Sequence, residues 1–451
     1  MAVAIGILLL VVITLLFHFF SPWWWTPIAA DWSDIDLIVD ITFWVTGVVF
    51  IALNGFLVWV VYRYRHREGV KAHYEPESKK LEWWLTILTT VGVVALLAPG
   101  LWVWGKIITV PDDAAVVEVV GQQWHWSFRF PGEDGVLGKV DIASMSVDNP
   151  FGMRADDPAG LDDVLVNSGE LHVPVDTNYK FVLRAKDVLH NFTVPQFRVK
   201  MDLIPGTTTY TWLKTTRIGR YDIMCEELCG IGHFAMRGVV VIDEQATFDE
   251  WLDGFPTYAE ILATPKPDLA AGQNLYAICS ACHGAQGEGN PVLNAPALAG
   301  QESWYIKRQL NHFKQGLRGT ESGDIYGAQM APMAATLADD TAVNNVAAYI
   351  ASLGGRSSSS TITGDIDNGE HLFNTCKSCH GTNGEGIWAL NAPRLNGIDD
   401  WYLVRQIENY KQGIRGTHPT DLYGKQMTLL SGMLRDEEDI NDVIAYINTL
   451  Q

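Results

Sequence analysis

All six cysteines of the chain stand close to a histidine, and four of them form a motif that occurs twice. The motif is Cys-x-x-Cys-His, and its residues are Cys279, Cys282 and His283 in one copy and Cys376, Cys379 and His380 in the other. The spacing lets two thiols form thioethers with porphyrin vinyl groups while the adjacent histidine binds the iron. A redox-active or zinc-binding Cys-x-x-Cys pair is the alternative. The two motifs predict two covalently attached haems c.

Both motifs lie in an internal repeat, in which residues 272–353 align without a gap onto residues 369–450. The repeat also selects the sixth iron ligands. Met330 superimposes on Met427, whereas Met333 falls on a leucine and Met433 on a threonine. We therefore predict Met330 and Met427 as axial ligands, with Met333 and Met433 as packing residues. Ligation by His and Met favours a raised reduction potential, which suits electron transfer.

The remaining cysteines, Cys225 and Cys229, form a second kind of site. His233 and Met236 follow Cys229 at +4 and +7, and His190 precedes the group. Thiolate, imidazole and thioether donors in one loop suit copper. A disulfide between Cys225 and Cys229 is the alternative in an oxidising compartment, but it leaves the two histidines and the methionine without a role.

The segments ahead of these sites predict a membrane anchor. Residues 2–20, 41–62 and 83–105 lack Asp, Glu, Lys and Arg for about the length that a helix needs to cross the lipid. The loop before the third segment is basic, which places it in the cytoplasm and the large C-terminal part outside. The first segment has no basic residue ahead of it, so a retained third helix is favoured over a signal peptide.

The outer part divides into a β-rich region and two helical repeats. Runs rich in Val, Phe and Thr from Ala115 to about Ile242 predict a β-sandwich or barrel, and residues 256–268, with three prolines, predict a linker. A connector rich in Gly and Ser separates the repeats at 354–363. The fold class is therefore multidomain: N-terminal transmembrane α-helices, an all-β domain and two all-α domains. The predicted boundaries are 1–108, 109–255, 268–354 and 365–451.

The charge of the chain limits the kinds of partner that it can bind. The formal net charge is −20, and the outer part carries no basic patch, so nucleic-acid binding is not expected. A negative surface of this kind would steer a basic protein partner toward it.

Residues 225–236, which we call the copper loop, and the segment 187–192 around His190 closely resemble subunit II of cytochrome c oxidase. The resemblance runs from the paired membrane helices to about Ile242. The two repeats resemble cytochrome c of the two-domain type. The resemblance implies a cupredoxin-like β domain with a binuclear copper centre, CuA, bridged by Cys225 and Cys229. His190, the carbonyl of Glu227, His233 and Met236 complete the implied ligand set. The Glu227 carboxylate is implied to bind a magnesium ion shared with subunit I.

Two further residues take a role from this resemblance. Segment 121–126 is similar to the aromatic segment at which family members receive electrons, which implicates Trp124. Gln122 and His125 stand there in place of the usual His and Tyr, and buried packing is the competing explanation for the indole. Glu82 matches the carboxylate at the mouth of a proton path into subunit I, although a charge at a helix start would also explain it.

The resemblance implies a redox relay. An external cytochrome c or respiratory complex would reduce the haems, and electrons would pass through CuA to haem a of subunit I in a caa3-like oxidase with other subunits. The expected location is the bacterial inner membrane, with the soluble domains on the periplasmic face. Subunit II of a CuA-type nitric oxide reductase is the alternative. A copper chaperone with an attached cytochrome is disfavoured because chaperones need exchangeable ligands, and nitrous oxide reductase shares the loop but not the membrane helices.

Overall fold

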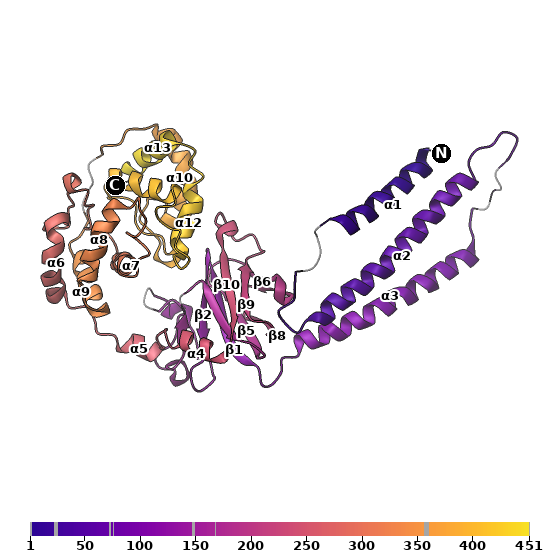
Figure 1. Cartoon of the computed structure of the whole chain (residues 1–451), viewed down its shortest axis with the longest axis horizontal. Coiled ribbons are helices and arrows are strands. Elements are labelled where there is room, and N and C mark those ends of the chain that lie inside the picture. The colour runs from indigo at the N-terminus through magenta and orange to yellow at the C-terminus, as the bar shows by residue number, and fades with distance from the viewer. Residues whose placement is uncertain are drawn as a thin grey trace.

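The computed structural model describes residues 2–21, 26–71, 74, 76–146, 149–166, 168–355 and 360–450. Its described parts form an elongated molecule with three long helices at one end, β-sheets in the middle and two groups of helices at the other end (Figure 1). The predicted fold class is confirmed. Residues 356–359 of the predicted connector lie outside the described residues.

In the described part of the chain, three helices are long and apolar enough to cross a membrane: α1 (Ala2–Phe20), α2 (Ser33–Arg63) and α3 (Lys79–Ile108). Their mean hydropathy reaches 2.8, 2.1 and 1.9, and most of their apolar surface is exposed, as expected for helices that face lipid or partner helices. Helices α2 and α3 are longer than their apolar segments because polar residues continue both helices at their ends. The basic loop between them lies at the far end from the β-sheets (Figure 1).

Ion pairs and an indole hydrogen bond join the membrane helices to one another and to the β domain. Lys106 at the end of α3 contacts Asp34 at the start of α2, with 2.5 Å between Nζ and Oδ2. Arg198 of the β domain donates to both carboxylate oxygens of Asp36, at 2.6 and 2.8 Å. Trp212 Nε1 donates to the carbonyl of Lys106 at 3.1 Å. These contacts fix the sheets at the outer end of the membrane helices.

The β domain is a sandwich of two five-stranded sheets, with strand orders β3-β2-β1-β5-β8 and β4-β10-β9-β6-β7. The strands are β1 (Ala115–Gln122), β2 (His125–Phe130), β3 (Val164–Val166), β4 (Glu170–Pro174), β5 (Asn178–Ala185), β6 (His190–Val194), β7 (Val199–Leu203), β8 (Thr209–Lys214), β9 (Gly219–Met224) and β10 (Arg237–Asp243). Alternate residues of β5 are buried, as its period-two pattern predicts. Phe181 and Phe192, one from each sheet, stack at 5.6 Å between ring centroids. Aromatic packing of this kind holds the two layers in register.

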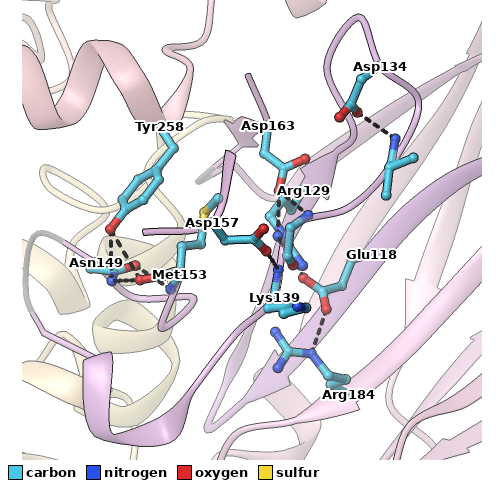
Figure 2. A network of polar contacts seen from close by, with 12 residues as sticks. Glu118, Arg129, Asp134, Lys139, Asn149, Met153, Asp157, Asp163, Arg184 and Tyr258 are labelled. Atoms are coloured by element: carbon cyan, nitrogen blue, oxygen red, sulfur yellow. Dashed lines mark hydrogen bonds and ion pairs between the residues drawn. The ribbon is translucent and has the colours of Figure 1, made fainter. Parts of the chain in front are cut away.

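A buried ionic network links strands β1, β2 and β5 of the first sheet to the segment between β2 and β3 (Figure 2). Arg129 donates to Glu118 at 2.7 Å, to Asp163 at 2.5 Å and to the carbonyl of Gly138 at 2.9 Å, and Arg184 donates to the second oxygen of Glu118 at 2.5 Å. Arg129, Glu118 and Asp163 are almost fully buried, so each charge depends on the others for compensation. The network attaches the long segment between β2 and β3 to the sheet.

The two C-terminal repeats fold alike. The first contains α6 (Leu269–His283), α7 (Ser303–Lys314), α8 (Ile325–Ala335) and α9 (Asp340–Ser352), and the second contains α10 (Ile366–His380), α11 (Asp400–Lys411), α12 (Leu422–Ser431) and α13 (Glu437–Asn448). The first and last helix of each repeat cross closely because a glycine stands at the crossing. A Cβ at Gly272 would lie 2.2 Å from the carbonyl oxygen of Asn345, and one at Gly369 would lie 2.1 Å from that of Asp442.

Two short helices connect the sandwich to the first repeat: α4 (Gln245–Leu252) and α5 (Tyr258–Ala263). Helix α5 lies inside the predicted linker, since Thr257 and Glu260 form a capping box that starts it. Tyr258 is buried and donates to the carbonyl of Met153 at 3.1 Å. The free part of the linker is therefore the short stretch after α5.

Candidate metal centres

The predicted copper ligands come from neighbouring strands of one sheet. Cys225, Cys229, His233 and Met236 lie on the loop that joins β9 to β10, and His190 is the first residue of β6. Strand β6 pairs with β9 at the end where the loop begins, through Thr193 and Met224. Pairing of the strands therefore brings His190 beside the cysteine loop although it is 35 residues away in sequence.

These side chains form one compact donor set. The Sγ atoms of Cys225 and Cys229 are 3.7 Å apart, and Cys225 Sγ lies 4.0 Å from His190 Nδ1. Cys229 Sγ lies 3.4 Å from His233 Nδ1 and 3.8 Å from Met236 Sδ. Ligands of one ion bound at about 2.0–2.3 Å in a tetrahedral site are separated by roughly 3.3–3.8 Å, so the donors fit a copper centre. The thiols are free, and a disulfide would need its sulfurs at about 2.05 Å.

The surroundings orient the donors. His190 is fully buried, and its Nε2 lies 2.8 Å from Asp187 Oδ1, which directs Nδ1 toward Cys225. The hydrogen bond between the two sulfurs lowers the pKa of Cys225 and raises that of Cys229. The carbonyl of Glu227 lies 3.3 Å from Cys225 Sγ. One thiol of the pair is thus readily ionised, as metal binding requires.

Trp124 packs directly on the copper loop. Its indole Nε1 donates to the carbonyl of Cys229 at 3.1 Å, and Gln123 Nε2 donates to the same oxygen at 2.7 Å. Gly232 leaves room for the ring, because a Cβ there would lie 2.4 Å from it. Trp124 is only 4% exposed. The indole is therefore buried between the loop and its surroundings.

Each repeat encloses a cavity at its Cys-x-x-Cys-His motif, of about 210 Å³ in the first and about 280 Å³ in the second. The histidines are buried and use Nδ1 in a hydrogen bond, His283 to the carbonyl of Pro296 at 2.8 Å and His380 to that of Pro393 at 2.7 Å. Burial lowers the pKa of both imidazoles. A neutral ring with Nε2 free fits iron ligation.

Both candidate methionines of each repeat line its cavity. Met333 and Met433 are 36% and 52% exposed, whereas Met330 and Met427 are more buried. The exposed pair lies at the rim of each cavity. The exposures therefore agree with the pair that the repeat selects.

The two haem cavities share a wall that the motifs did not reveal. Arg415 donates to Gln406 at 2.7 Å and to Gln309 at 2.8 Å, and Arg318 donates to the same two glutamine oxygens at 3.3 and 2.7 Å. Both guanidinium groups are buried, and the partners that these bonds give them are neutral amides. Arg318 and Arg415 occupy equivalent positions of the repeat, as do Gln309 and Gln406, and that equivalence is the signal that could have found them.

Comparison with known proteins gives these sites a family. The cytochrome c oxidase subunit II periplasmic domain matches residues 115–243, and cytochrome c matches residues 269–354 and 366–451. The alternative cytochrome c oxidase subunit 2 of Bradyrhizobium diazoefficiens is 51% identical over 259 residues, which cover 57% of this chain and 94% of that protein. The chain belongs to the cytochrome c oxidase subunit II family.

Two further relatives extend the comparison. The cytochrome c oxidase subunit 2 of Cereibacter sphaeroides is 30% identical over 246 residues, which cover 51% of this chain and 80% of that protein. The solved structure of reduced recombinant cytochrome c4 from Pseudomonas stutzeri is 29% identical and covers 41% of this chain and all of its own, with a TM-score of 0.34.

Membership of the family assigns the parts of the chain. It is a membrane-anchored electron-transfer subunit of an oxidoreductase complex, with a periplasmic cupredoxin-like domain for copper and two cytochrome c domains for haem c. We refer to the β domain as the copper domain, and to the repeats as cytochrome domains 1 and 2.

Cytochrome domain 2 contacts the copper domain beside the copper loop, with α12 next to the sheets (Figure 1). Gln426 Nε2 donates to the carbonyl of Trp124 at 2.6 Å. The His125 ring meets the Tyr423 ring edge to face, with centroids 5.2 Å apart. Gln122 donates to the carbonyl of Ala389. The two residues that depart from the family pattern, Gln122 and His125, thus face domain 2.

Glu82 lies apart from these sites. It is in the first turn of α3, at the end of the helix that is remote from the copper domain. Its side chain is exposed. The structure thus places Glu82 where the basic loop meets the membrane helix.

Proposed function

We propose that the chain is subunit II of a caa3-like cytochrome c oxidase, which relays electrons from an external donor through two haems c and a binuclear CuA centre to haem a of subunit I. One observation carries the proposal. Gln426 of cytochrome domain 2 donates to Trp124, and Trp124 donates to the carbonyl of the copper ligand Cys229. Trp124 therefore bridges the second cytochrome domain and the copper loop. We propose that electrons enter the copper domain at Trp124.

The proposed copper ligands are the two bridging thiolates of Cys225 and Cys229, with His190, the carbonyl of Glu227, His233 and Met236. When bound, two coppers that share thiolates supply a one-electron carrier. The protein holds the donors on the loop between β9 and β10 and on the adjacent strand β6, and His190, Cys229 and Met236 are at most 2% exposed. A rigid and dry donor set needs little rearrangement when the oxidation state changes.

The proposed haem ligands are His283 with Met330 and His380 with Met427, and the thioether positions are Cys279, Cys282, Cys376 and Cys379. When bound, a haem with His and Met ligands supplies a one-electron iron carrier. The buried guanidinium groups of Arg318 and Arg415 suit the negatively charged carboxylates of a haem.

Substitution tests the axial assignment. Met330→Leu should remove the thioether-to-iron absorbance band of one haem and lower its potential, while Met333→Leu should leave both unchanged. Loss of the band in Met333→Leu alone would show that Met333 is the ligand.

The remaining roles concern the other subunits. We propose that Glu227 binds a magnesium ion at the subunit I interface and that Glu82 lies at the mouth of a proton path into subunit I. Leu228 and Phe234, on the copper loop, are 78% and 53% exposed, and subunit I would cover them. The proposed domains run over 1–108, 109–255, 268–354 and 365–451, in a bacterial inner membrane with the soluble domains in the periplasm.

A double substitution tests the relay. In the purified complex, replacing His283 and His380 with alanine should abolish rapid oxidation of reduced cytochrome c and leave the copper spectrum intact. Undiminished copper reduction in stopped-flow kinetics would make the haems a side branch and Trp124 the main entry point for electrons from the donor. Measurement of oxygen against nitric oxide consumption by the same complex separates the oxidase from the nitric oxide reductase alternative.

A further inference from the structure

The two cytochrome domains carry the same surface around the mouth of the haem cavity, and we call this surface the haem-edge face. Repeat equivalence defines it on both domains. In domain 1 it comprises Ile278, Cys282, Val292, Leu293, Ile325 and Gln329, and in domain 2 it comprises Thr375, Cys379, Ala389, Leu390, Leu422 and Gln426.

In domain 2 the copper domain covers this face. Ala389 and Gln426 hydrogen-bond to Gln122 and Trp124. Leu422 packs on the backbone of Gly169, where a Cβ would lie 2.3 Å from its Cδ2. Cys379, a thioether position, packs against the hydrophobic core of the copper domain. The haem-edge face of domain 2 is therefore an interface between two redox domains.

In domain 1 the equivalent face is open. Val292 is 87% exposed, Ile325 64%, and Ile278 and Leu293 are 49% exposed each. Cys282 is exposed as well, whereas its counterpart Cys379 is half-buried. Every one of these side chains is more exposed than its equivalent in domain 2. An apolar patch of this kind on a periplasmic surface usually binds a partner.

We infer that the haem-edge face of domain 1 is the docking surface for the electron donor, a small soluble redox protein whose metal edge is surrounded by apolar residues. The inference rests on the proposed function. The occupant follows from the repeat, because the same face of domain 2 binds a redox domain through apolar packing and neutral hydrogen bonds. The net charge of −20 would attract a basic carrier, and apolar contact would then hold it.

This docking fixes the direction of transfer along the chain. A haem held by His283 would accept one electron from the donor, which would be oxidised in turn, and no bond would form and no proton would be transferred. Domain 2 and the copper loop bury Trp124, so the donor has no direct access to it in this arrangement. Electrons therefore arrive at domain 1, pass to domain 2 across the shared wall of the cavities, and reach the copper domain last.

The test uses the full chain in the oxidase complex, with Val292→Glu and Ile325→Glu as separate variants. The probe is a reduced, soluble single-haem cytochrome c. Each variant should weaken binding of the probe, and slow its bimolecular oxidation, by at least about tenfold, which corresponds to roughly 1.4 kcal/mol for an unpaired carboxylate at an apolar contact. The rate of transfer from domain 2 to copper should not change.

Leu269→Glu is the matched control. Leu269 is also 49% exposed, but it lies at the other end of α6, roughly 20 Å from Cys282 along the helix. It should leave binding and rate unchanged. Unchanged binding and rate in both face variants would overturn the inference. A change of oligomeric state in Val292→Glu without a change in rate would assign the face to a second copy of the chain and would also overturn it.

Failure of the proposed function has a different signature. In that case the variant that lacks His283 and His380 would still pass electrons rapidly from the probe to copper. If only the docking inference is wrong, that variant is inactive while Val292→Glu and Ile325→Glu behave like the unmodified complex.

Discussion

Cytochrome domains 1 and 2 have equivalent helices and equivalent haem cavities, but the haem-edge face is covered in domain 2 and exposed in domain 1. The predicted haem-attachment residues are the same in both, as Cys282 and Cys379 illustrate. Three of the six positions of the haem-edge face keep their residue and three differ: Ile278 corresponds to Thr375, Val292 to Ala389, and exposed Ile325 to the packed Leu422. Duplication thus preserved the chemistry of the site and adapted one copy to a fixed partner.

The contact between the two domains is itself nearly symmetric. Arg308 donates to the side chain of Asn391 and lies 4.3 Å from the Tyr423 ring centroid. Arg405 donates to Asn294 at 2.5 Å and lies 4.3 Å from the Tyr326 centroid. Paired contacts of this kind hold the domains in one arrangement. Among the described residues, the difference between the domains therefore arises outside their shared interface, where domain 2 contacts the copper domain.

The largest effect on electron transfer to copper is expected when arginine replaces Leu422 of domain 2 but not when it replaces the equivalent Ile325 of domain 1. Leu422→Arg buries a guanidinium against Gly169, which should separate domain 2 from the copper domain and slow transfer to copper by at least about a hundredfold, or roughly 2.7 kcal/mol. Ile325→Arg should leave that internal step unchanged. Flash reduction of the haems followed by copper absorbance measures it. Equal slowing by both variants would remove the distinction between the faces.

Acidification should weaken the contact between the haem-edge face of domain 2 and the copper domain. Burial first, and then the charges of Lys186 and Arg308, lower the pKa of His125 from its ordinary 6.5 to about 3 in the docked state. The undocked form therefore takes up a proton that the docked form does not, so docking weakens as pH falls through the ordinary pKa. Between about pH 7 and pH 5 the loss is roughly 2 kcal/mol. The charged and titratable groups around the ring are Lys186, Arg308, Asp187, His190 and Tyr423.

His125→Phe provides the control for this pH dependence. It keeps an aromatic ring against Tyr423 but has no titrating group. The internal transfer to copper should then lose its slowing at low pH. A pH profile that is identical in the variant and the unmodified complex would exclude His125 as the cause.

Much of the site could be predicted because its donor atoms are close in sequence. The copper loop places four of its predicted donors within 12 residues, and the repeat alone predicts Met330 rather than Met333 as an iron ligand. Helix α5 was missed because three prolines outweighed its capping box. The amide and guanidinium wall between the cavities depends on how two domains pack, which no local pattern encodes. The contact of domain 2 with the copper domain had a weak signal in the sequence, because Gln122 and His125 stand in place of the usual His and Tyr.

The smallest expected effect on internal electron transfer is the difference between alanine substitutions at the equivalent residues Gln426 and Gln329. Gln426→Ala removes the hydrogen bond to the Trp124 carbonyl and should weaken docking of domain 2 by about 1 kcal/mol, roughly fivefold. Gln329→Ala, on the exposed face of domain 1, should leave internal transfer unchanged. The internal rates of both variants, measured after flash reduction, check the prediction. A slower internal step in Gln329→Ala would contradict it.

Stopped-flow mixing of the complex with reduced cytochrome c tests the central claim most directly. Separate haem and copper signals, with Met330→Leu and Met427→Leu used to assign each haem, give the order of reduction. The account predicts that the domain 1 haem is reduced first, at a rate proportional to donor concentration, and that the domain 2 haem and copper follow at rates independent of it. Copper reduction that depends on donor concentration and precedes the haem signals would contradict the account.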